Sequence, residues 1–269
     1  MKKICFFPNT SKQEAVNVAN ELQHYVKSLG IDCFTAPSNT SLSEADFLVV
    51  LGGDGTMLRA ARETAAFSTP LLGINIGKLG YLTDVEPNRA KEAISAVING
   101  NFKTEKRMML EAKTDCPNSA TLLALNDFYI YRGAHVRLLE FEIYVNGEFI
   151  EKLSSDGLII CTPTGSTAYN LSAGGPILKP NAEMIAITPI CPHALHARPF
   201  VLPSNDEIVI KIATDGQTPG NLVFADGEIY CGRPCGKITI KRSSLYASII
   251  KTNDKSFFDV MRMKLIEKL

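Results

Sequence analysis

The chain has 269 residues, of which 45% are hydrophobic and 21% are charged, as is ordinary for a globular protein. Its 28 Lys and Arg residues balance its 28 Asp and Glu residues, so no overall charge attracts nucleic acid or an anionic membrane. The apolar run after Lys3 is too short for a signal peptide, and no apolar run approaches the roughly 20 residues that span a bilayer. We therefore expect a cytoplasmic protein with no nucleic acid and no membrane as partners.

The first hundred residues alternate between apolar runs typical of buried strands and apolar residues at helical spacing. The strands are expected at 3–7, 31–34, 46–51 and 71–76, and the helices at 11–29, 56–66 and 88–98. This alternation predicts a parallel sheet covered on both faces by helices. We expect an N-terminal open parallel-sheet α/β domain over residues 1–105.

After residue 105 the pattern changes to strands without long amphipathic helices. The strands are expected at 122–131, 138–152, 158–161, 207–213, 221–225 and 237–250, with Asn146-Gly147 as a hairpin turn. This predicts a C-terminal β-rich domain over residues 106–250, so the fold class is α/β plus mostly-β. The tail resumes a helical period with Ser256 as its N-cap, and we expect residues 251–269 to form a helix that packs back on the N-terminal domain.

The cysteines and histidines do not predict a metal centre. The seven cysteines are scattered, and several lie in apolar strand-like runs, as buried free thiols do. Cys231 and Cys235 lack a second pair of ligands at zinc spacing. His193 and His196 lie among prolines that oppose a helix, so they are not expected to share a helix face.

Chemistry is indicated first by Gly52-Gly53-Asp54-Gly55-Thr56, which follows a predicted buried strand and opens a helix. Glycines let a ligand approach the backbone, and the free N–H groups of a helix N-terminus favour phosphate. A carboxylate there repels phosphate, so Asp54 is best explained if it takes a proton from an attacking hydroxyl or supports a bound cation. The alternative is that Asp54 only caps the helix.

Two further groups of polar residues lie in the β-rich half. Residues 162–176 read TPTGSTAYNLSAGGP, a density of hydroxyls that a plain turn does not need. Tyr169 in this segment can stack on a flat ring. Asn126 and Asp127 interrupt an apolar strand, and an amide beside a carboxylate suits ribose hydroxyls or a base edge; solvent exposure is the other explanation.

The chain contains neither the GxxxxGK[ST] pattern of P-loop enzymes nor the GxGxxG pattern of dinucleotide-binding dehydrogenases. It also has no GxSxG nucleophile motif and no convincing Ser/His/Asp set. Gly80 and Tyr81 belong to a weaker glycine cluster after the fourth strand, where they could form a neighbouring wall of a ligand cleft.

With these motifs assembled, the chain resembles the bacterial NAD kinases from about residue 45 to residue 250. The matching segments, in the family's order, are 52–55, Asn126-Asp127, 162–176 and 188–199. The resemblance implies transfer of a phosphoryl group from ATP, or from polyphosphate, to the 2′-hydroxyl of the adenosine ribose of NAD. It also implies a homodimer or homotetramer, with Mg²⁺ or another divalent cation brought by the phosphoryl donor.

The resemblance assigns roles to particular residues. Asp54 would be catalytic, and Gly52, Gly53 and Thr56 would contact phosphate. NAD-binding roles are implied for Gly55, Arg59, Tyr81, Asn126, Asp127, Arg137, Ser154, Asp156, Thr164, Thr167, Ala168, Tyr169, Ser172 and Cys191. The chain departs from the family at Tyr81, where many relatives have Phe, at Ser154, where many have Arg, and at Glu228, where Gln is common.

Two other functions remain open at this point. A lipid kinase of the diacylglycerol or sphingosine type has a similar glycine-aspartate turn, but it would need a membrane-facing surface. A non-catalytic regulator would bind the dinucleotide without converting it.

Overall fold

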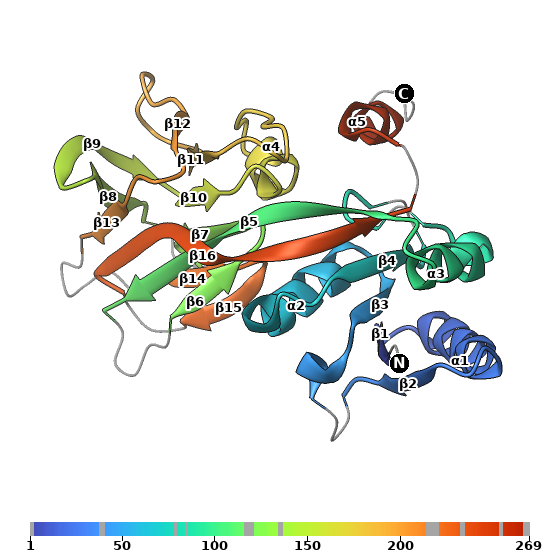
Figure 1. Cartoon of the computed structure of the whole chain (residues 1–269). Helices are drawn as coiled ribbons and strands as arrows, with labels where there is room; N and C mark the ends of the chain where they lie inside the picture. Colours follow the sequence, from blue (N-terminus) through green and yellow to red (C-terminus); the bar gives the residue numbers. More distant parts are fainter. Residues whose placement is uncertain are drawn as a thin grey trace. The chain divides into compact units, whose positions relative to one another are not determined.

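The computed structural model describes residues 3–37, 41–77, 80–83, 85–115, 121–133, 137–213, 221–231, 235–252 and 255–265 (Figure 1). The chain divides into two compact units: unit 1 comprises Met1–Arg107 and Leu245–Leu269, and unit 2 comprises Met108–Ser244. The divisions fall inside two long strands, β5 (Lys103–Thr114) and β16 (Lys237–Lys251), rather than in linkers. The sequence had suggested boundaries near residues 105 and 250.

Unit 1 is the α/β half, and the expected fold class is confirmed. Its strands are β1 (Lys3–Pro8), β2 (Asp32–Thr35), β3 (Phe47–Gly52) and β4 (Leu71–Asn75). They pair in parallel in the order β2-β1-β3-β4, and Ile249 of β16 pairs in parallel with Leu71. The helices are α1 (Gln13–Ser28), α2 (Asp54–Thr64), α3 (Ala90–Ile98) and α5 (Phe257–Leu265), with 3₁₀ turns η1 (Leu42–Glu44), η2 (Ala65–Phe67) and η3 (Pro87–Arg89).

The core of unit 1 explains why its strands are uninterrupted apolar runs. All six residues of β3 and all five of β4 are buried, as expected for a parallel sheet with helices on both faces. Leu22 of α1 and Ile94 of α3 pack in one cluster with Val49 and Ile74. Each such side chain contributes about 1.5–3 kcal/mol by leaving water, and the resulting rigid sheet fixes the turn that follows β3.

Unit 2 is the β-rich half. One sheet has the order β12-β11-β10-β7-β14-β15, and its pairings are antiparallel. Those strands are β7 (Asp127–Tyr131), β10 (Gly157–Cys161), β11 (Met184–Ile190), β12 (Phe200–Pro203), β14 (Leu222–Ala225) and β15 (Glu228–Cys231). The others are β6 (Leu122–Ala124), which pairs with β5, β8 (Leu139–Val145), β9 (Glu148–Ser155) and β13 (Ile208–Ile212). The short helix α4 (Tyr169–Ser172) and the 3₁₀ turn η4 (Gly165–Thr167) complete the unit.

One apolar cluster fills unit 2 and joins side chains from both groups of strands. Phe128 and Leu158 lie in the first sheet, and Phe141 and Ile208 lie in the pairing of β8 with β13. Phe141 and Phe128 are fully buried. This core positions the loops that connect β6 with β7 and follow β10.

Several local predictions are confirmed. Asn146 and Gly147 have φ values of 51° and 84° and connect β8 to β9, as a tight hairpin with this dipeptide requires. The Ser256 hydroxyl accepts a hydrogen bond from the Asp259 backbone N–H at 3.2 Å, and the Asp259 carboxylate accepts one from the Ser256 backbone N–H at 3.0 Å. This reciprocal cap starts α5 at Phe257.

The strand predicted over 122–131 is wrong as a single element. The structure breaks it into β6 and β7, because Leu125 and Asn126 turn their backbone N–H groups to the Asp226 carboxylate. The sequence analysis also missed β5, β11, β12 and β15. Among the described residues, no helix is long and apolar enough to cross a membrane.

Candidate active site

Asp54 is the first residue of α2, directly after the glycines that end β3. Its carboxylate accepts hydrogen bonds from the backbone N–H groups of Tyr81 at 2.8 Å and Leu82 at 2.9 Å. Gly53 is the N-cap residue, and no side chain caps the helix. The interpretation of Asp54 as a helix cap is therefore wrong: the side chain is oriented by a loop distant in sequence.

Gly80 permits this arrangement. A Cβ atom at Gly80 would overlap Oδ1 of Asp54 and the Thr83 hydroxyl. Only glycine lets the 80–82 backbone approach the carboxylate closely enough to donate two hydrogen bonds. The sequence grouped Gly80 and Tyr81 near the expected ligand, and the structure brings both to Asp54.

The same carboxylate faces a cation. Nζ of Lys264, on α5, lies 3.8 Å from Oδ2 of Asp54 and 4.0 Å from the centroid of the Tyr81 ring. Tyr81 is partly buried, its hydroxyl has no hydrogen-bond partner, and burial together with the charge of Asp54 raises its pKa. Lys264 was not among the residues that the sequence analysis selected.

The other predicted site residues of the turn and of α2 differ in burial and in hydrogen bonding. The Thr56 backbone N–H already donates to the Gly53 carbonyl at 3.0 Å, so it belongs to the first turn of the helix. A Cβ at Gly53 or Gly55 would meet nothing within 4 Å, whereas one at Gly52 would overlap Thr56. Arg59 lies 4.8 Å from the Phe7 ring centroid and 3.8 Å from Glu63. The Arg59 Nε atom is buried without a hydrogen-bond partner.

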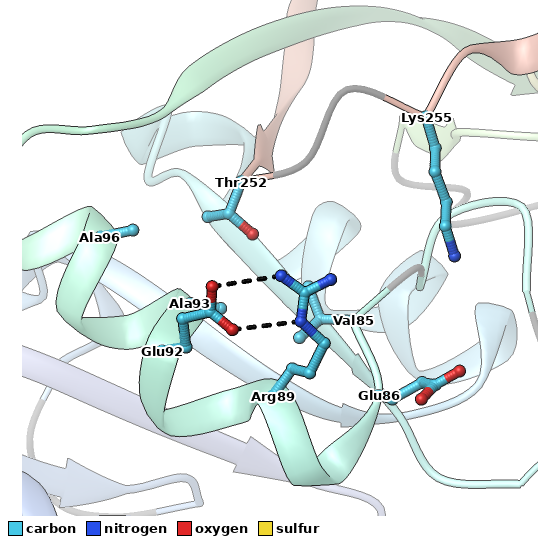
Figure 2. A pocket seen from close by; sticks show the side chains of 8 residues that line it. All are labelled: Val85, Glu86, Arg89, Glu92, Ala93, Ala96, Thr252 and Lys255. Atoms are coloured by element: carbon cyan, nitrogen blue, oxygen red, sulfur yellow. Dashed lines mark hydrogen bonds and ion pairs between the residues drawn. The ribbon is translucent and has the colours of Figure 1, made fainter.

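A pocket described in unit 1 is lined by none of these residues. It holds about 110 Å³ and is lined by Val85, Glu86, Arg89, Glu92, Ala93, Ala96, Thr252 and Lys255. Figure 2 shows the Arg89 guanidinium paired with Glu92 of α3, with hydrogen bonds of 3.1 and 3.2 Å. Both side chains are largely exposed, so the pair is solvated and contributes little to stability.

In unit 2, Asn126 and Asp127 are held in a turn by Asp226. The Asp226 carboxylate accepts hydrogen bonds from the N–H groups of Leu125 at 3.0 Å, Asn126 at 2.7 Å and Asp127 at 3.3 Å. Asp226 has a φ of 50°, which Asp tolerates better than most residues. In the sequence, the dipeptide Asp226-Gly227 indicates a tight turn, but it does not indicate that the carboxylate binds the Asn126-Asp127 segment.

Asp127 is the most perturbed carboxyl group of this turn. Its side chain is only 3% exposed. Burial, and next the charge of Asp226, raise the pKa of Asp127 to about 7. A neutral carboxyl can donate a hydrogen bond as well as accept one, which suits recognition of a sugar hydroxyl.

Many polar side chains of the segment 162–176 form hydrogen bonds that stabilise the loop itself. The Thr162 hydroxyl donates to the Leu125 carbonyl at 2.6 Å, and Ser166 bridges Pro163 and Leu178. Asn170 is fully buried: its amide donates to the Ser166 and Pro176 carbonyls and accepts from Thr188 at 2.6 Å. Several of these polar side chains therefore stabilise the loop itself, and ligand binding by the rest of the segment stays a prediction.

Other residues of the segment are at least partly exposed or have an unpartnered hydroxyl; the Thr167 hydroxyl donates a long hydrogen bond to the Thr164 carbonyl at 3.4 Å. Tyr169 is 37% exposed, and its ring meets Tyr129 edge-on at 5.2 Å, while Tyr129 stacks on Phe224 at 4.3 Å. The Thr164 hydroxyl is buried without a hydrogen-bond partner. Thr167 and Ala168 are half-buried, and Ser172 is exposed. These positions remain available to a ligand, and Tyr169 presents part of an aromatic face.

Asp156, Ser154 and Cys191 lie together at the ends of β9, β10 and β11. Asp156 Oδ1 is 2.5 Å from Nε of Arg132, a residue that the sequence analysis missed. The Ser154 carbonyl accepts from His193 N–H at 3.0 Å, and Cys191 is an exposed free thiol with a φ of 47°. Arg137 is also exposed in unit 2, and the side chain of Cys231 lies outside the described residues.

In the described part of the chain, no three His, Cys, Asp or Glu side chains gather as a metal site would require. The Asp54 carboxylate keeps lone pairs beyond its two hydrogen bonds. Carboxylate oxygens suit Mg²⁺, so its chemistry is compatible with a cation carried by donor phosphates.

An α/β unit with a carboxylate in a glycine turn, together with a β-rich unit whose loops offer polar and aromatic groups, fits the class of kinases that phosphorylate a hydroxyl group of a small molecule. Family models match the chain in both parts: the ATP-NAD kinase N-terminal domain over residues 39–102 and the ATP-NAD kinase C-terminal domain over residues 125–252. The chain belongs to the NAD kinase family, and it is an enzyme that phosphorylates NAD.

Relatives and solved structures agree with this assignment. The NAD kinase of Thermoanaerobacter sp. is 38% identical over the full length of both chains, and that of Acetivibrio thermocellus is 37% identical over 100% of this chain and 98% of its own. Yeast NADH kinase complexed with NADH superposes with a TM-score of 0.89 at 25% identity, over 99% of this chain and 88% of its own. The Archaeoglobus fulgidus NAD kinase in complex with ATP gives 0.80 at 25% identity, over 97% and 99%. These findings favour the NAD kinase interpretation over a lipid kinase or a non-catalytic regulator.

Proposed function

We propose that Asp54 is the catalytic carboxylate of this enzyme and that ATP is its phosphoryl donor. The observation that carries the proposal is the orientation of the Asp54 side chain by the Tyr81 and Leu82 N–H groups. A carboxylate held by two backbone donors has a fixed direction, which a general base or hydroxyl-orienting group needs.

The proposed reaction needs only ATP, the ribose hydroxyl and the Asp54 carboxylate. The 2′-oxygen of the adenosine ribose forms a bond to the γ-phosphorus of ATP, while the bond from that phosphorus to the β,γ-bridging oxygen breaks. The hydroxyl proton passes to the Asp54 carboxylate, and ADP leaves with the bond's electron pair. Since phosphoryl transfer depends mainly on positioning and charge stabilisation, the chain needs no covalent intermediate.

Mg²⁺, bound to the donor phosphates, would supply charge neutralisation during the transfer. Gly52, Gly53 and Thr56 would lie against phosphate, with Gly55 and Arg59 nearby on α2. The solved relatives, one in complex with ATP and one in complex with NADH, support ATP as the donor and NADH, beside NAD, as an acceptor to test. Polyphosphate is the alternative donor.

Unit 2 would hold the dinucleotide. Asn126 and Asp127 suit the ribose hydroxyls and amide groups, and Tyr169 with Thr164, Thr167, Ala168 and Ser172 suits the adenine. Asp156, with Arg132 beside it, would face the nicotinamide half, accompanied by Ser154, Arg137 and Cys191. We further propose a cytoplasmic homodimer or homotetramer in which strand edges of unit 2 associate.

The test is direct. Purified protein is incubated with NAD, Mg²⁺ and either ATP or polyphosphate, and NADP is quantified with an NADP-specific dehydrogenase. NADP formation with ATP supports the proposal, and formation only with polyphosphate refutes the donor assignment. Binding of NAD by calorimetry without any NADP under either condition would favour a regulator and overturn the proposal.

A further inference from the structure

A carboxylate at a phosphate-handling turn presents an electrostatic problem. Each phosphate of the donor is negatively charged, and Asp54 is negative as well. Two unit charges about 4 Å apart interact strongly where the local dielectric is below that of water. The Tyr81 and Leu82 amides are neutral, so they orient the carboxylate without removing its net charge.

The structure supplies a cation for this purpose from the C-terminal helix. Nζ of Lys264 lies 3.8 Å from Oδ2 of Asp54. The Lys264 side chain is 20% exposed and the Asp54 side chain 31% exposed, so bulk water screens this pair less than it screens a surface pair. Lys264 is therefore the described cation that pairs with the proposed base.

The Lys264 side chain also contacts the Tyr81 ring, which favours its position near Asp54. Its ammonium group lies 4.0 Å from the centroid of Tyr81, within the range of a cation–π interaction. Phe257, two turns earlier on the same face of α5, lies with its ring centroid 6.4 Å from that of Tyr81. Tyr81 therefore docks α5 at two points, and it also donates its own backbone N–H to Asp54.

We propose that Lys264 is a positioning residue for phosphoryl transfer, which neutralises Asp54 so that the phosphates of the donor can approach a charged base. The proposal rests on the proposed role of Asp54, because the ammonium acts through that carboxylate. It gives α5 a part in the reaction: the helix carries the counter-charge of the glycine-aspartate turn.

The experiment is a double-mutant cycle on binding, which does not require turnover. Dissociation constants for a non-hydrolysable ATP analogue with Mg²⁺ are measured by calorimetry for wild type, Lys264→Met, Asp54→Asn and the double variant. We expect Lys264→Met to weaken binding about tenfold in the wild-type background, where the carboxylate is left uncompensated, and less than about twofold in the Asp54→Asn background. Methionine keeps an unbranched stem over Tyr81, so packing is largely preserved.

Two further variants separate charge from structure. Lys264→Arg should restore most of the affinity and most of kcat/KM for ATP. Arg262→Met is the matched control: it lies on the same helix, its only described ion pair is with Asp259 at 3.6 Å, and it should change neither value. Thermal unfolding of all variants reports whether α5 stays folded.

Equal losses from Lys264→Met in both backgrounds would overturn the proposal, since the lysine would then act on phosphate directly or through the fold. Unchanged affinity in the wild-type background, or failure of Lys264→Arg to restore it, would do the same. Failure of the proposed function has another signature: Asp54→Asn would retain full turnover, whatever the binding cycle gives.

Discussion

Replacement of Asp226 by glycine tests how the Asn126-Asp127 turn is built. Glycine accepts the φ of 50° at this position without strain, so Asp226→Gly removes the carboxylate and leaves the backbone conformation accessible. The substitution takes the acceptor from three backbone N–H groups, two of them at 3.0 Å or less. A hydrogen bond to a charged acceptor contributes about 1.5–3 kcal/mol. With the two shorter bonds at the low end, because Asp226 is only half-buried, we expect a loss of about 3 kcal/mol, or roughly 6–12 °C in Tm.

The pH dependence of this loss is a sharper test, because it involves Asp127. The pKa of Asp127 is raised to about 7 in the folded protein by burial and by the charge of Asp226. Since the folded state holds this proton more tightly than the unfolded state, the stability from Asp127 is fully present below the ordinary carboxyl pKa of 3.8, falls as the pH rises from there to about 7, and is gone above it. Asp226→Gly removes the repulsive neighbour, so it should cost less free energy of unfolding at pH 8.5 than at pH 6.

Urea unfolding followed by circular dichroism at pH 6 and pH 8.5 measures both effects. Asp206→Gly is the control, since its described side-chain contact is one exposed hydrogen bond, from Asn146, and it should change stability by less than about 1 kcal/mol. A loss under about 1 kcal/mol for Asp226→Gly would refute the claim that this carboxylate organises the turn. A loss that grows from pH 6 to pH 8.5 would refute the electrostatic coupling to Asp127.

The remaining predictions concern activity. Asp54→Asn should lower kcat by about 10²–10⁴-fold, because an amide cannot take the proton and its NH₂ group would face one of the two backbone donors; folding and NAD binding should persist, and a collapse of the Tm instead would indicate a structural residue. Gly80→Ala should lower kcat at least about tenfold with a smaller effect on Tm, since the new Cβ would displace the Asp54 carboxylate; wild-type kinetics would contradict the close approach. Tyr169→Ala should raise the KM for NAD with little change in the KM for ATP, and an unchanged KM for NAD would remove the stacking role.

The α/β half was predictable because its signals are local. Its buried parallel strands are continuous apolar runs, and its helices have apolar residues at helical spacing. Both patterns can be recognised without knowing which elements they pack against. The β-rich half was harder. The first four residues of β5 are charged or polar and exposed, so the start of β5 gave no apolar signal. The carboxyl end of β11 overlaps the segment 188–199, which was treated as a motif and not as a strand. The break between β6 and β7 depends on Asp226, which is a hundred residues away in the chain.

The candidate site shows the same division. Glycine and aspartate in sequence indicated Asp54 directly, since residue types and order carry that signal. The sequence grouped Gly80 and Tyr81 near the expected ligand, but it could not show that the N–H groups of Tyr81 and Leu82 orient Asp54, because backbone N–H groups are present at every position except proline. Lys264 lies in a helix whose sequence contains no motif that indicates a functional residue. Only the tertiary structure brings it close to Asp54.

The orientation of Asp54 also resolves why a carboxylate is compatible with this position. At the N-terminus of α2, an acidic side chain that turned back onto its own helix would occupy the N–H groups that favour phosphate. The Tyr81 and Leu82 amides hold it away from them. In the proposed mechanism, the helix N-terminus and the carboxylate would therefore have separate tasks, one toward the donor phosphates and one toward a hydroxyl. Because that separation needs a backbone close to the carboxylate, the proposed mechanism requires the glycine at position 80 as much as the aspartate at position 54.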